Sequence, residues 1–416
     1  MAWRLLSILI LSVPAFSQPA GNELKSKLRS AEAAGQVDSV GYYLSLLSTH
    51  YLDNNQPDSA KLYFRRAIAF NSETENFERL AENYNNLGVL HHQQGSWDSS
   101  VYYYTEAYGV YRSMRDTTKM AVLEINLGGL YRQKGLYEKS LEYLLQASRQ
   151  LEKTAATSNL ATCYSMIASL YTDIGELSSS LDFHYKALTV RQKLGLKAGM
   201  SSSYNNIGNV YMVLNQLDSA LANFNKSLRL KRELKDVIGQ AICLNNIGEL
   251  MLRNGDLKES ERLLKESLAM RIAVKHYPGE LSTRINLANL YLTKHDFFEA
   301  EEELQTAEKM ALSLELLDEL REVYMLQVRL HQQRGNVDKA LDYSQRLIVV
   351  KDSLLNRDKA KAMAEMQARY ESLKKEDRIK LLEKEGLLQA VELERRQLWI
   401  QMMAVGMVLI LIIVAL

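Results

Sequence analysis

A column of asparagines recurs in this sequence at intervals of 40 residues or a multiple of 40. Its members are Asn86, Asn126, Asn206, Asn246 and Asn286, and the same helical stripe continues at Asn209 and Asn289. A carboxamide both donates and accepts hydrogen bonds, so this stripe suits a peptide or protein segment better than a phosphate. Asparagine inside a helix costs about 0.5 kcal/mol relative to alanine, so its repeated use indicates a purpose. We therefore predict that these seven side chains contact a peptide or protein partner.

The column has two alternative origins that the sequence leaves open. Duplicated repeats can inherit an asparagine without using it, and an asparagine can bridge neighbouring helices. The column is also interrupted at Leu46, Met166 and Leu326, so any ladder along it has gaps.

Residues that usually carry catalysis form no recognisable constellation. The sequence contains no phosphate-binding glycine loop and no GxGxxG, HExxH, CxxC or GxSxG motif. His91 and His331 fall in a column of mostly aromatic residues, where packing is the simpler role. Cys163 and Cys243 stand 80 residues apart, two whole repeats, so we expect two buried thiols rather than a disulfide. We predict a non-enzyme without metal or cofactor.

The elements that carry the asparagines are predicted from further columns with the same interval. A small residue, preceded in seven of the eight copies by Leu or Ile, occurs at Ser48, Gly88, Gly128, Ala168, Gly208, Gly248, Ala288 and in the last copy is Val328. An aromatic residue, His or Met follows three positions later, and these offsets share one face of a helix.

A turn is predicted after each of these helices. Residues that tolerate a left-handed C-cap stand at Asn55, Gly95, Gly135, Gly175, Asn215, Gly255 and Gly335. The following residue is often a good N-cap, as at Ser96, Asp256, Asp296 and Asn336, and Asp256 and Asp296 have capping-box spacing to Glu259 and Glu299. Each unit is therefore a helix, a tight turn and a second helix.

The second helix carries the strictest column, which is Ala or Ser in all eight copies. Its members are Ala60, Ser100, Ser140, Ser180, Ala220, Ser260, Ala300 and Ala340, and seven residues later small residues recur from Ala67 to Ala307. Only a close approach of two helix backbones requires such a column.

The order Ile207-Gly208, Tyr211, Ala220 and Phe224 resembles the tetratricopeptide repeat. The resemblance covers residues 38–356 in eight copies, with a period of 40 rather than about 34, as in the 40-residue class of these repeats. It implies an all-α, right-handed α-solenoid of eight helix hairpins. In that family the concave groove holds extended peptides, and the same asparagine position bonds the ligand backbone. The last copy departs from the pattern at Gln327 and Ser344, as a capping repeat should.

Both ends of the chain predict contact with a membrane. Residues 1–17 have the charged start, short apolar run and small-residue cleavage site of a signal peptide. Residues 398–416 carry no charge, and a helix of that length spans about 28 Å, close to a bilayer core. We therefore expect an inner-membrane protein whose repeats are periplasmic. Arg395 and Arg396 fit this orientation poorly, because positive charge usually collects on the cytoplasmic side.

The remaining segments complete the predicted organisation. Residues 18–37 form an N-terminal capping helix, and residues 357–397 form a long charged helix, either a coiled coil that joins two copies or a single rod. This stretch resembles the juxtamembrane part of bacterial membrane regulators, in which a histidine-kinase or DNA-binding output follows; no such output occurs in these residues. The 51 basic and 50 acidic side chains nearly cancel, so we predict no nucleic-acid partner.

Three functions are compatible with this organisation. The leading one is a membrane-anchored periplasmic module that binds a peptide or protein segment in its groove and belongs to a signalling system. The alternatives are a scaffold for envelope proteins without signalling, and a tail-anchored cytoplasmic adaptor.

Overall fold

The computed structural model describes residues 21–153 and 157–356, and every regular element in these ranges is an α-helix. The elements are α1 (Gly21–Ala33), α2 (Val37–Asp53), α3 (Pro57–Glu73), α4 (Phe77–Gln93), α5 (Trp97–Ser113), α6 (Thr117–Gln133), α7 (Tyr137–Leu151), α8 (Ser158–Asp173), α9 (Leu177–Lys193), α10 (Lys197–Val213), α11 (Leu217–Glu233), α12 (Val237–Asn254), α13 (Leu257–Ala273), α14 (Tyr277–Lys294), α15 (Phe297–Ser313) and α16 (Leu317–Gln333). A further helix covers 337–356.

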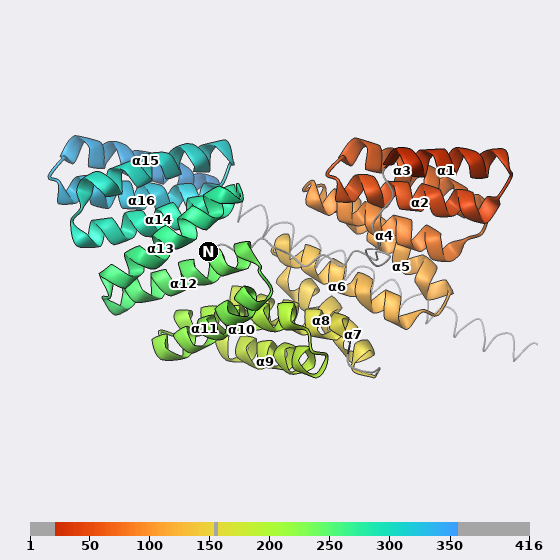
Figure 1. Ribbon diagram of the computed structural model, residues 1–416, viewed down its shortest axis with the longest axis horizontal. Helices are drawn as coiled ribbons and strands as arrows, with labels where there is room; N and C mark the ends of the chain where they lie inside the picture. The colour runs from red at the N-terminus through yellow and green to blue at the C-terminus, as the bar shows by residue number, and fades with distance from the viewer. Residues whose placement is uncertain (1–20, 154–156, 357–416) are drawn as a thin grey trace, which may run out of the picture. The chain divides into compact units, whose positions relative to one another are not determined.

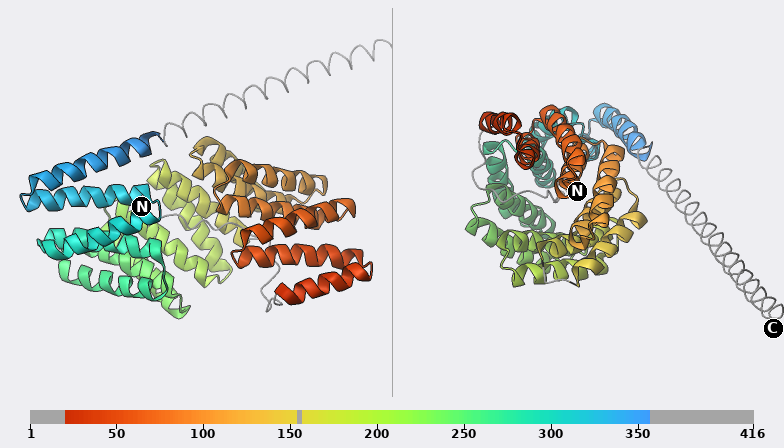
Figure 2. Two further views of the ribbon diagram at one scale, coloured as in Figure 1. Left: turned by 90° about the horizontal axis from the view of Figure 1, so that it is seen from above. Right: turned by 90° about the vertical axis from the view of Figure 1, so that its right-hand side faces the viewer.

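The helices stack in the order of the chain as an α-solenoid (Figures 1 and 2). Each even-numbered helix from α2 to α14 packs on the helix after it, which is the second helix of its pair, and on the helix before it. The predicted all-α solenoid of helix pairs is therefore confirmed. At its start, α1 packs on α2, and its Leu24 and Leu28 share one apolar cluster with Leu47 and Phe64.

Every connection in the described ranges passes through one residue in the left-handed region, and these residues are spaced by 20. The turn within a pair uses Asn55, Gly95, Gly135, Gly175, Asn215, Gly255, His295 and Gly335, which confirms the seven predicted positions and adds His295. The turn between pairs uses Gly35, Glu75, Arg115, Gly195, Lys235, Lys275 and Glu315, which the sequence did not reveal. Most of these residues in the turns between pairs are of types that favour other conformations, so the residue types did not indicate a left-handed turn.

The predicted helix caps are only partly right. Asp256 accepts a hydrogen bond from the Glu259 amide at 3.1 Å, and Asn336 accepts one from Lys339. Ser96 and Asp296 stand at the predicted N-cap positions, but neither side chain makes a cap hydrogen bond. The carboxylate of Asp296 instead pairs with Lys294 Nζ at 2.6 Å.

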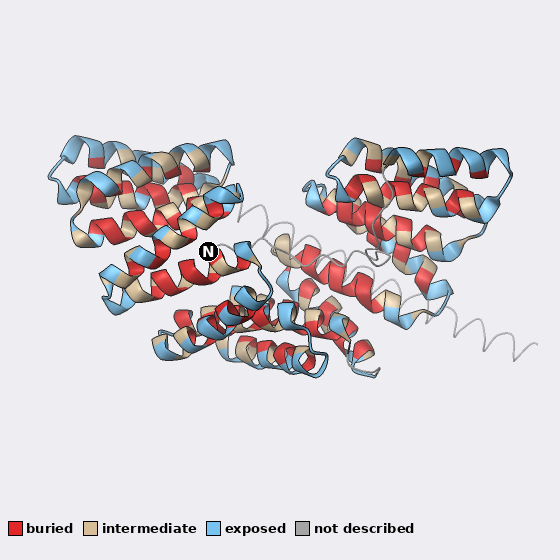
Figure 3. Cartoon of the chain, in the orientation of Figure 1, coloured by how far each residue is buried: buried red, intermediate tan, exposed pale blue. Residues whose placement is uncertain are grey.

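The column of small residues lies in the seam between the two helices of each pair, as predicted. Ala220 and its equivalents are buried, and Ser100 Oγ donates a 2.8 Å hydrogen bond to the Gly88 carbonyl in the facing helix. Ser140 and Ser260 repeat this bond to Gly128 and Gly248. Figure 3 shows buried residues running along the first helices, most continuously along α6. Close backbone approach is therefore what restricts this column to Ala and Ser.

Three predicted segments lie wholly outside the described residues: the signal peptide (1–17), the charged helix (357–397) and the membrane span (398–416). Within residues 21–153 and 157–356, none of the helices combines the length and the apolar character that crossing a membrane requires. Cys163 and Cys243 do lie in the described part, and both are buried free thiols, as predicted.

Candidate functional site

The seven predicted asparagines lie on five first helices, which are α4, α6, α10, α12 and α14. Neighbouring first helices also pack directly on one another, as in α2 on α4, α6 on α8, and α12 on both α10 and α14. In the described part of the chain, second helices of neighbouring pairs make no comparable contact. We call the side of the array that carries the asparagine column the first-helix face.

Three members of the column bridge neighbouring pairs through a second asparagine that lies outside the column. Asn126 Nδ2 donates to Asn85 Oδ1, Asn246 Nδ2 to Asn205 Oδ1, and Asn286 Nδ2 to Asn245 Oδ1, each at 3.1 Å. Each acceptor lies 41 residues before its donor. Bridging between helices, one of the two alternative origins of the column, is therefore confirmed for these three side chains.

A signal for the acceptor residues was present in the sequence. Asn85-Asn86, Asn205-Asn206 and Asn245-Asn246 are consecutive asparagine pairs at the same place in the repeat. The first member of each pair is buried, which is unusual for an asparagine without a structural role. Only the second member belongs to the predicted column.

The other predicted asparagines differ in how many hydrogen bonds their side-chain amides make within the protein. Asn86 is buried and its Oδ1 accepts a hydrogen bond from Asn85. Asn289 Oδ1 accepts one from Arg329 at 3.0 Å. Asn209 Oδ1 accepts from Asn246 at 3.3 Å, whereas its Nδ2 is buried without a partner among the described residues.

Asn206 is the member most available to another molecule. Its side chain is half-buried and makes no hydrogen bond with any described residue. It lies one helical turn from Asn209 on α10, so one unused amide and one unpartnered Nδ2 share a stripe of this helix. Buried amide hydrogens without acceptors are uncommon in folded proteins.

Charged and polar pairs also connect first helices on either side of the asparagines. His92 Nε2 lies 2.7 Å from Gln133 Oε1, and burial lowers the pKa of His92. Arg132 on α6 donates to Asp173 on α8 at 2.6 Å. Within α12, Glu249 pairs with Arg253 at 2.7 Å. The face thus carries both charges and amides, with no excess of one sign among these groups.

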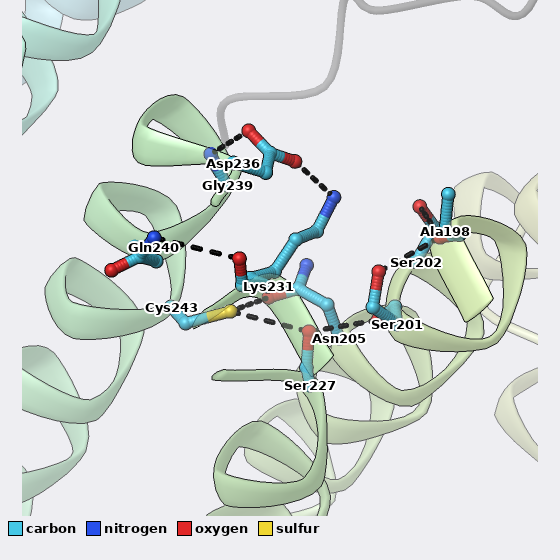
Figure 4. A network of polar contacts seen from close by, with 10 residues as sticks. All are labelled: Ala198, Ser201, Ser202, Asn205, Ser227, Lys231, Asp236, Gly239, Gln240 and Cys243. Carbon is cyan, nitrogen blue, oxygen red and sulfur yellow. Dashed lines mark hydrogen bonds and ion pairs between the residues drawn. The ribbon is translucent and has the colours of Figure 1, made fainter. Parts of the chain in front are cut away.

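A polar network leads from the asparagines to the connection between α11 and α12 (Figure 4). Ser227 Oγ donates to the Ser201 carbonyl at 2.8 Å, and Cys243 Sγ lies 3.2 Å from Ser227 Oγ and 3.9 Å from Asn205 Oδ1. Burial raises the pKa of the Cys243 thiol, which therefore stays protonated and serves as a weak donor. Cys243, predicted from the sequence only as a small buried residue, thus also has polar contacts.

An open cavity among the described residues lies elsewhere. Its volume is about 530 Å³, and it is lined by residues of α8 and α9 that include Tyr164, Tyr171, Phe183 and Lys186. None of the predicted asparagines lines it. No group of three or more His, Cys, Asp or Glu side chains within the described ranges is arranged to hold a metal ion.

The comparison of this sequence with family models decides its family. The tetratricopeptide repeat model matches residues 119–193, 199–273 and 240–313. This chain is a tetratricopeptide-repeat protein. The helix pairs outside residues 119–313 continue the same interval of 40 residues. The comparison with curated proteins returned no match.

Solved structures share the fold of this tetratricopeptide-repeat protein at low sequence identity. A Rap protein in complex with the competence and sporulation factor is 15% identical, with a TM-score of 0.54 and coverage of 81% of this chain and 99% of the other. The quorum sensor NprR from B. thuringiensis is 14% identical, with a TM-score of 0.59 and coverage of 80% and 100%. A signal-transduction ATPase with a tetratricopeptide repeat sensor from Pyrococcus horikoshii is 11% identical, with a TM-score of 0.60 and coverage of 82% and 52%.

Proposed function

We propose that this tetratricopeptide-repeat protein binds an extended peptide or protein segment on its first-helix face, centred on Asn206 and Asn209. The observation that carries the proposal is the unbonded side-chain amide of Asn206 together with the unpartnered Nδ2 of Asn209, both on α10. A peptide backbone offers alternating donors and acceptors, which such amides bind in both directions. The fold shared with a Rap protein that holds a signalling factor, and with the quorum sensor NprR, supports this class of ligand.

The three bridging asparagines have a different part in this proposal. Asn126, Asn246 and Asn286 hold neighbouring pairs at a fixed spacing, and Asn206 and Asn209 contact the ligand. Asn86 and Asn289 flank this centre and remain predicted contacts.

A displayed library of random peptides tests the binding site. Peptides selected on the full chain are measured against the double variant Asn206→Ala with Asn209→Ala, and against Asn225→Ala as a matched control. Asn225 is exposed on the second helix α11 and makes no side-chain hydrogen bond with a described residue. We expect at least a tenfold loss of affinity for the double variant and none for the control. Equal affinity for all three proteins would rule out this site.

In the same proposal the protein is moored in the inner membrane with its repeats in the periplasm and takes part in signalling. Residues 1–17 direct export, residues 398–416 span the bilayer, and residues 357–397 connect the repeats to the span, with or without pairing to a second copy. The sequence patterns of both termini support this arrangement.

Two measurements separate this arrangement from its alternatives. A mature chain that starts at Gln18 supports export, whereas an intact Met1 favours the tail-anchored cytoplasmic adaptor. A partner that changes its activity when a selected peptide binds supports signalling, whereas a set of constantly bound envelope proteins favours the scaffold.

A further inference from the structure

The connection between α11 and α12 contains a carboxylate held between a basic side chain and a helix start. Asp236 Oδ2 lies 2.7 Å from Lys231 Nζ, and Asp236 Oδ1 accepts a 2.8 Å hydrogen bond from the Gly239 amide (Figure 4). A Cβ atom on Gly239 would lie only 2.5 Å from the Lys231 side chain, so glycine gives the lysine room to cross. The partial positive charge at the N-terminus of α12 and the paired Lys231 cation both stabilise the negative charge of this carboxylate.

The connection between α13 and α14 repeats this arrangement 40 residues later without the carboxylate. Arg271 stands where Lys231 stood, Gly279 where Gly239 stood, and His276 replaces Asp236. A Cβ atom on Gly279 would again be crowded, at 3.1 Å from the Arg271 side chain. The basic residue and the glycine that accommodates it are thus retained, while none of the described residues supplies their anionic partner.

Arg271 is a buried cation that no acidic side chain balances. It is 4% exposed, forms no ion pair with a described residue, and donates to the Gly279 carbonyl. Its Nε has no hydrogen-bond partner in the described part of the chain. Burial lowers the pKa of Arg271 to about 10, and no neighbouring carboxylate opposes this shift. An unbalanced buried charge is costly, so a bound anion would relieve it.

The start of α14 adds further unused groups at the same place. His276 provides no side-chain cap for this helix, and its Nδ1 is buried without a described partner. Its ring lies against Gly279, in the position that the Asp236 carboxylate occupies beside Gly239. Because the ring nitrogen makes no hydrogen bond there, the imidazole loses none when it turns aside. A helix N-terminus next to a cation is a favourable place for an anion.

From this comparison within one chain we infer that Arg271 and the amide of Gly279 form a binding site for a carboxylate group of a ligand, which takes the place of the His276 ring. The carboxylate of Asp236 indicates which chemical group the ligand should carry, because it bonds to the equivalent lysine and glycine amide one repeat earlier. The carboxylate belongs either to a free small acid or to a peptide, as its C-terminus. This site lies at a connection between pairs and is independent of the asparagines on α10.

The connection between α9 and α10 is an internal comparison. Arg191 and Gly199 again occupy the basic and glycine positions, with Leu196 at the third. There Arg191 donates a 2.6 Å hydrogen bond to Ser203 Oγ, and none of its side-chain nitrogens is buried without a partner. We therefore assign the site to the α13–α14 connection alone.

Thermal unfolding of the full chain, purified in detergent, tests the assignment. The midpoint is measured at constant pH and ionic strength in sodium chloride and in sodium acetate. A peptide with a free C-terminus is then compared with the same peptide carrying a C-terminal amide. For the wild-type chain we expect acetate to raise the midpoint by about 2 °C relative to chloride, as ligand binding to the folded state requires. A rise with the free-acid peptide at much lower concentration would identify a peptide terminus as the source, and a rise with acetate alone would identify a small acid.

The matched variants are His276→Asp and Asp236→His. His276→Asp supplies the carboxylate from within, so we expect a higher midpoint in chloride and no response to acetate. Asp236→His removes the internal carboxylate and should add an acetate response at the α11–α12 connection. Equal acetate responses in the wild type and His276→Asp, or no response in the wild type, would overturn the inference. Arg271 would then act only as a cation at the C-terminus of α13. This test does not depend on peptide binding by Asn206 and Asn209.

Discussion

Asn246 donates a 3.1 Å hydrogen bond from Nδ2 to Oδ1 of Asn205, which belongs to the preceding helix pair. Asn205→Ala removes this acceptor and should lower the free energy of unfolding by about 1–2 kcal/mol, because the half-buried Asn246 amide loses a partner. Asn206→Ala, at the next residue, should change it by less than about 0.5 kcal/mol, since its side chain bonds to no described group. Urea unfolding followed by circular dichroism measures both. Equal losses would contradict the division between bridging and free asparagines.

Lys275 holds a left-handed conformation, with φ of 53°, in the turn between α13 and α14. Lys275→Gly should raise the free energy of unfolding by about 0.5–1 kcal/mol, because glycine adopts this conformation without a steric penalty. Lys309→Gly on the exposed side of α15 should instead lower it by about 1 kcal/mol. Thermal unfolding of the two variants gives the comparison. Two changes of the same sign would contradict the conformational argument.

Gln327 on α16 is buried, and both polar atoms of its amide lack partners within the described residues. Equivalent positions in the other repeats carry Leu or Ile. Gln327→Leu should therefore stabilise this end of the array by about 1–3 kcal/mol, because the unpaired amide is replaced by the apolar residue type that the equivalent positions use. Gln333→Leu, at an exposed site in the same helix, serves as the control and should have little effect. Hydrogen exchange of α16 measures the local gain, and equal protection in both variants would refute it.

Glu124 is fully buried between α5 and α7 and accepts hydrogen bonds from Gln150 and Tyr108. Burial raises its pKa from 4.5 to about 7, although both hydrogen bonds lower it. The folded chain therefore keeps a proton that the unfolded chain releases, and stability should fall as the pH rises from 4.5 to 7.

Glu124→Gln removes this titration. We expect the variant to exceed the wild type by about 3 kcal/mol at pH 8, and the difference to shrink below pH 5. Melting temperatures across this pH range provide the measurement. Parallel profiles of the two proteins would show that Glu124 does not titrate in this window.

Gly208 faces the ring of Phe224 so closely that a Cβ atom would lie 2.6 Å from it. Gly208→Ala should therefore destabilise the fold by about 1–3 kcal/mol. Combining it with Phe224→Leu should recover part of the loss, because the repeat with Ala288 at the small position carries Leu304 opposite. A double-mutant cycle measures the coupling. Strictly additive effects would show that the two side chains do not compete for this space.

The architecture was accessible from the sequence because its determinants are side-chain types that recur in columns. The small residues at Ala220 and Gly208 report close backbone contact, and glycine at Gly95 and Gly255 reports a left-handed turn. The turns between pairs escaped detection because Glu75 and Lys275 adopt the same conformation only under tertiary constraint. Ser96 and Asp296 matched a cap pattern, but the side chain of Asp296 pairs with a lysine instead.

The candidate site was only partly accessible for a different reason. A column identifies a recurring side chain, but it does not state what that side chain contacts. The partner of Asn246 lies 41 residues away and was hidden as the first member of the Asn205-Asn206 pair. The availability of Asn206 depends on which neighbouring amides are already satisfied, and only coordinates contain that information.

The left-handed residue that recurs every 20 positions makes each connection interchangeable with the next equivalent one. Removal or duplication of one whole pair, such as 197–236, would join turns that both have a left-handed residue at the same position, and would leave the spacing of the remaining pairs unchanged. Unequal recombination can therefore lengthen or shorten the array in frame by whole units. The length of the first-helix face can then change in evolution without any change in the side chains of a single repeat.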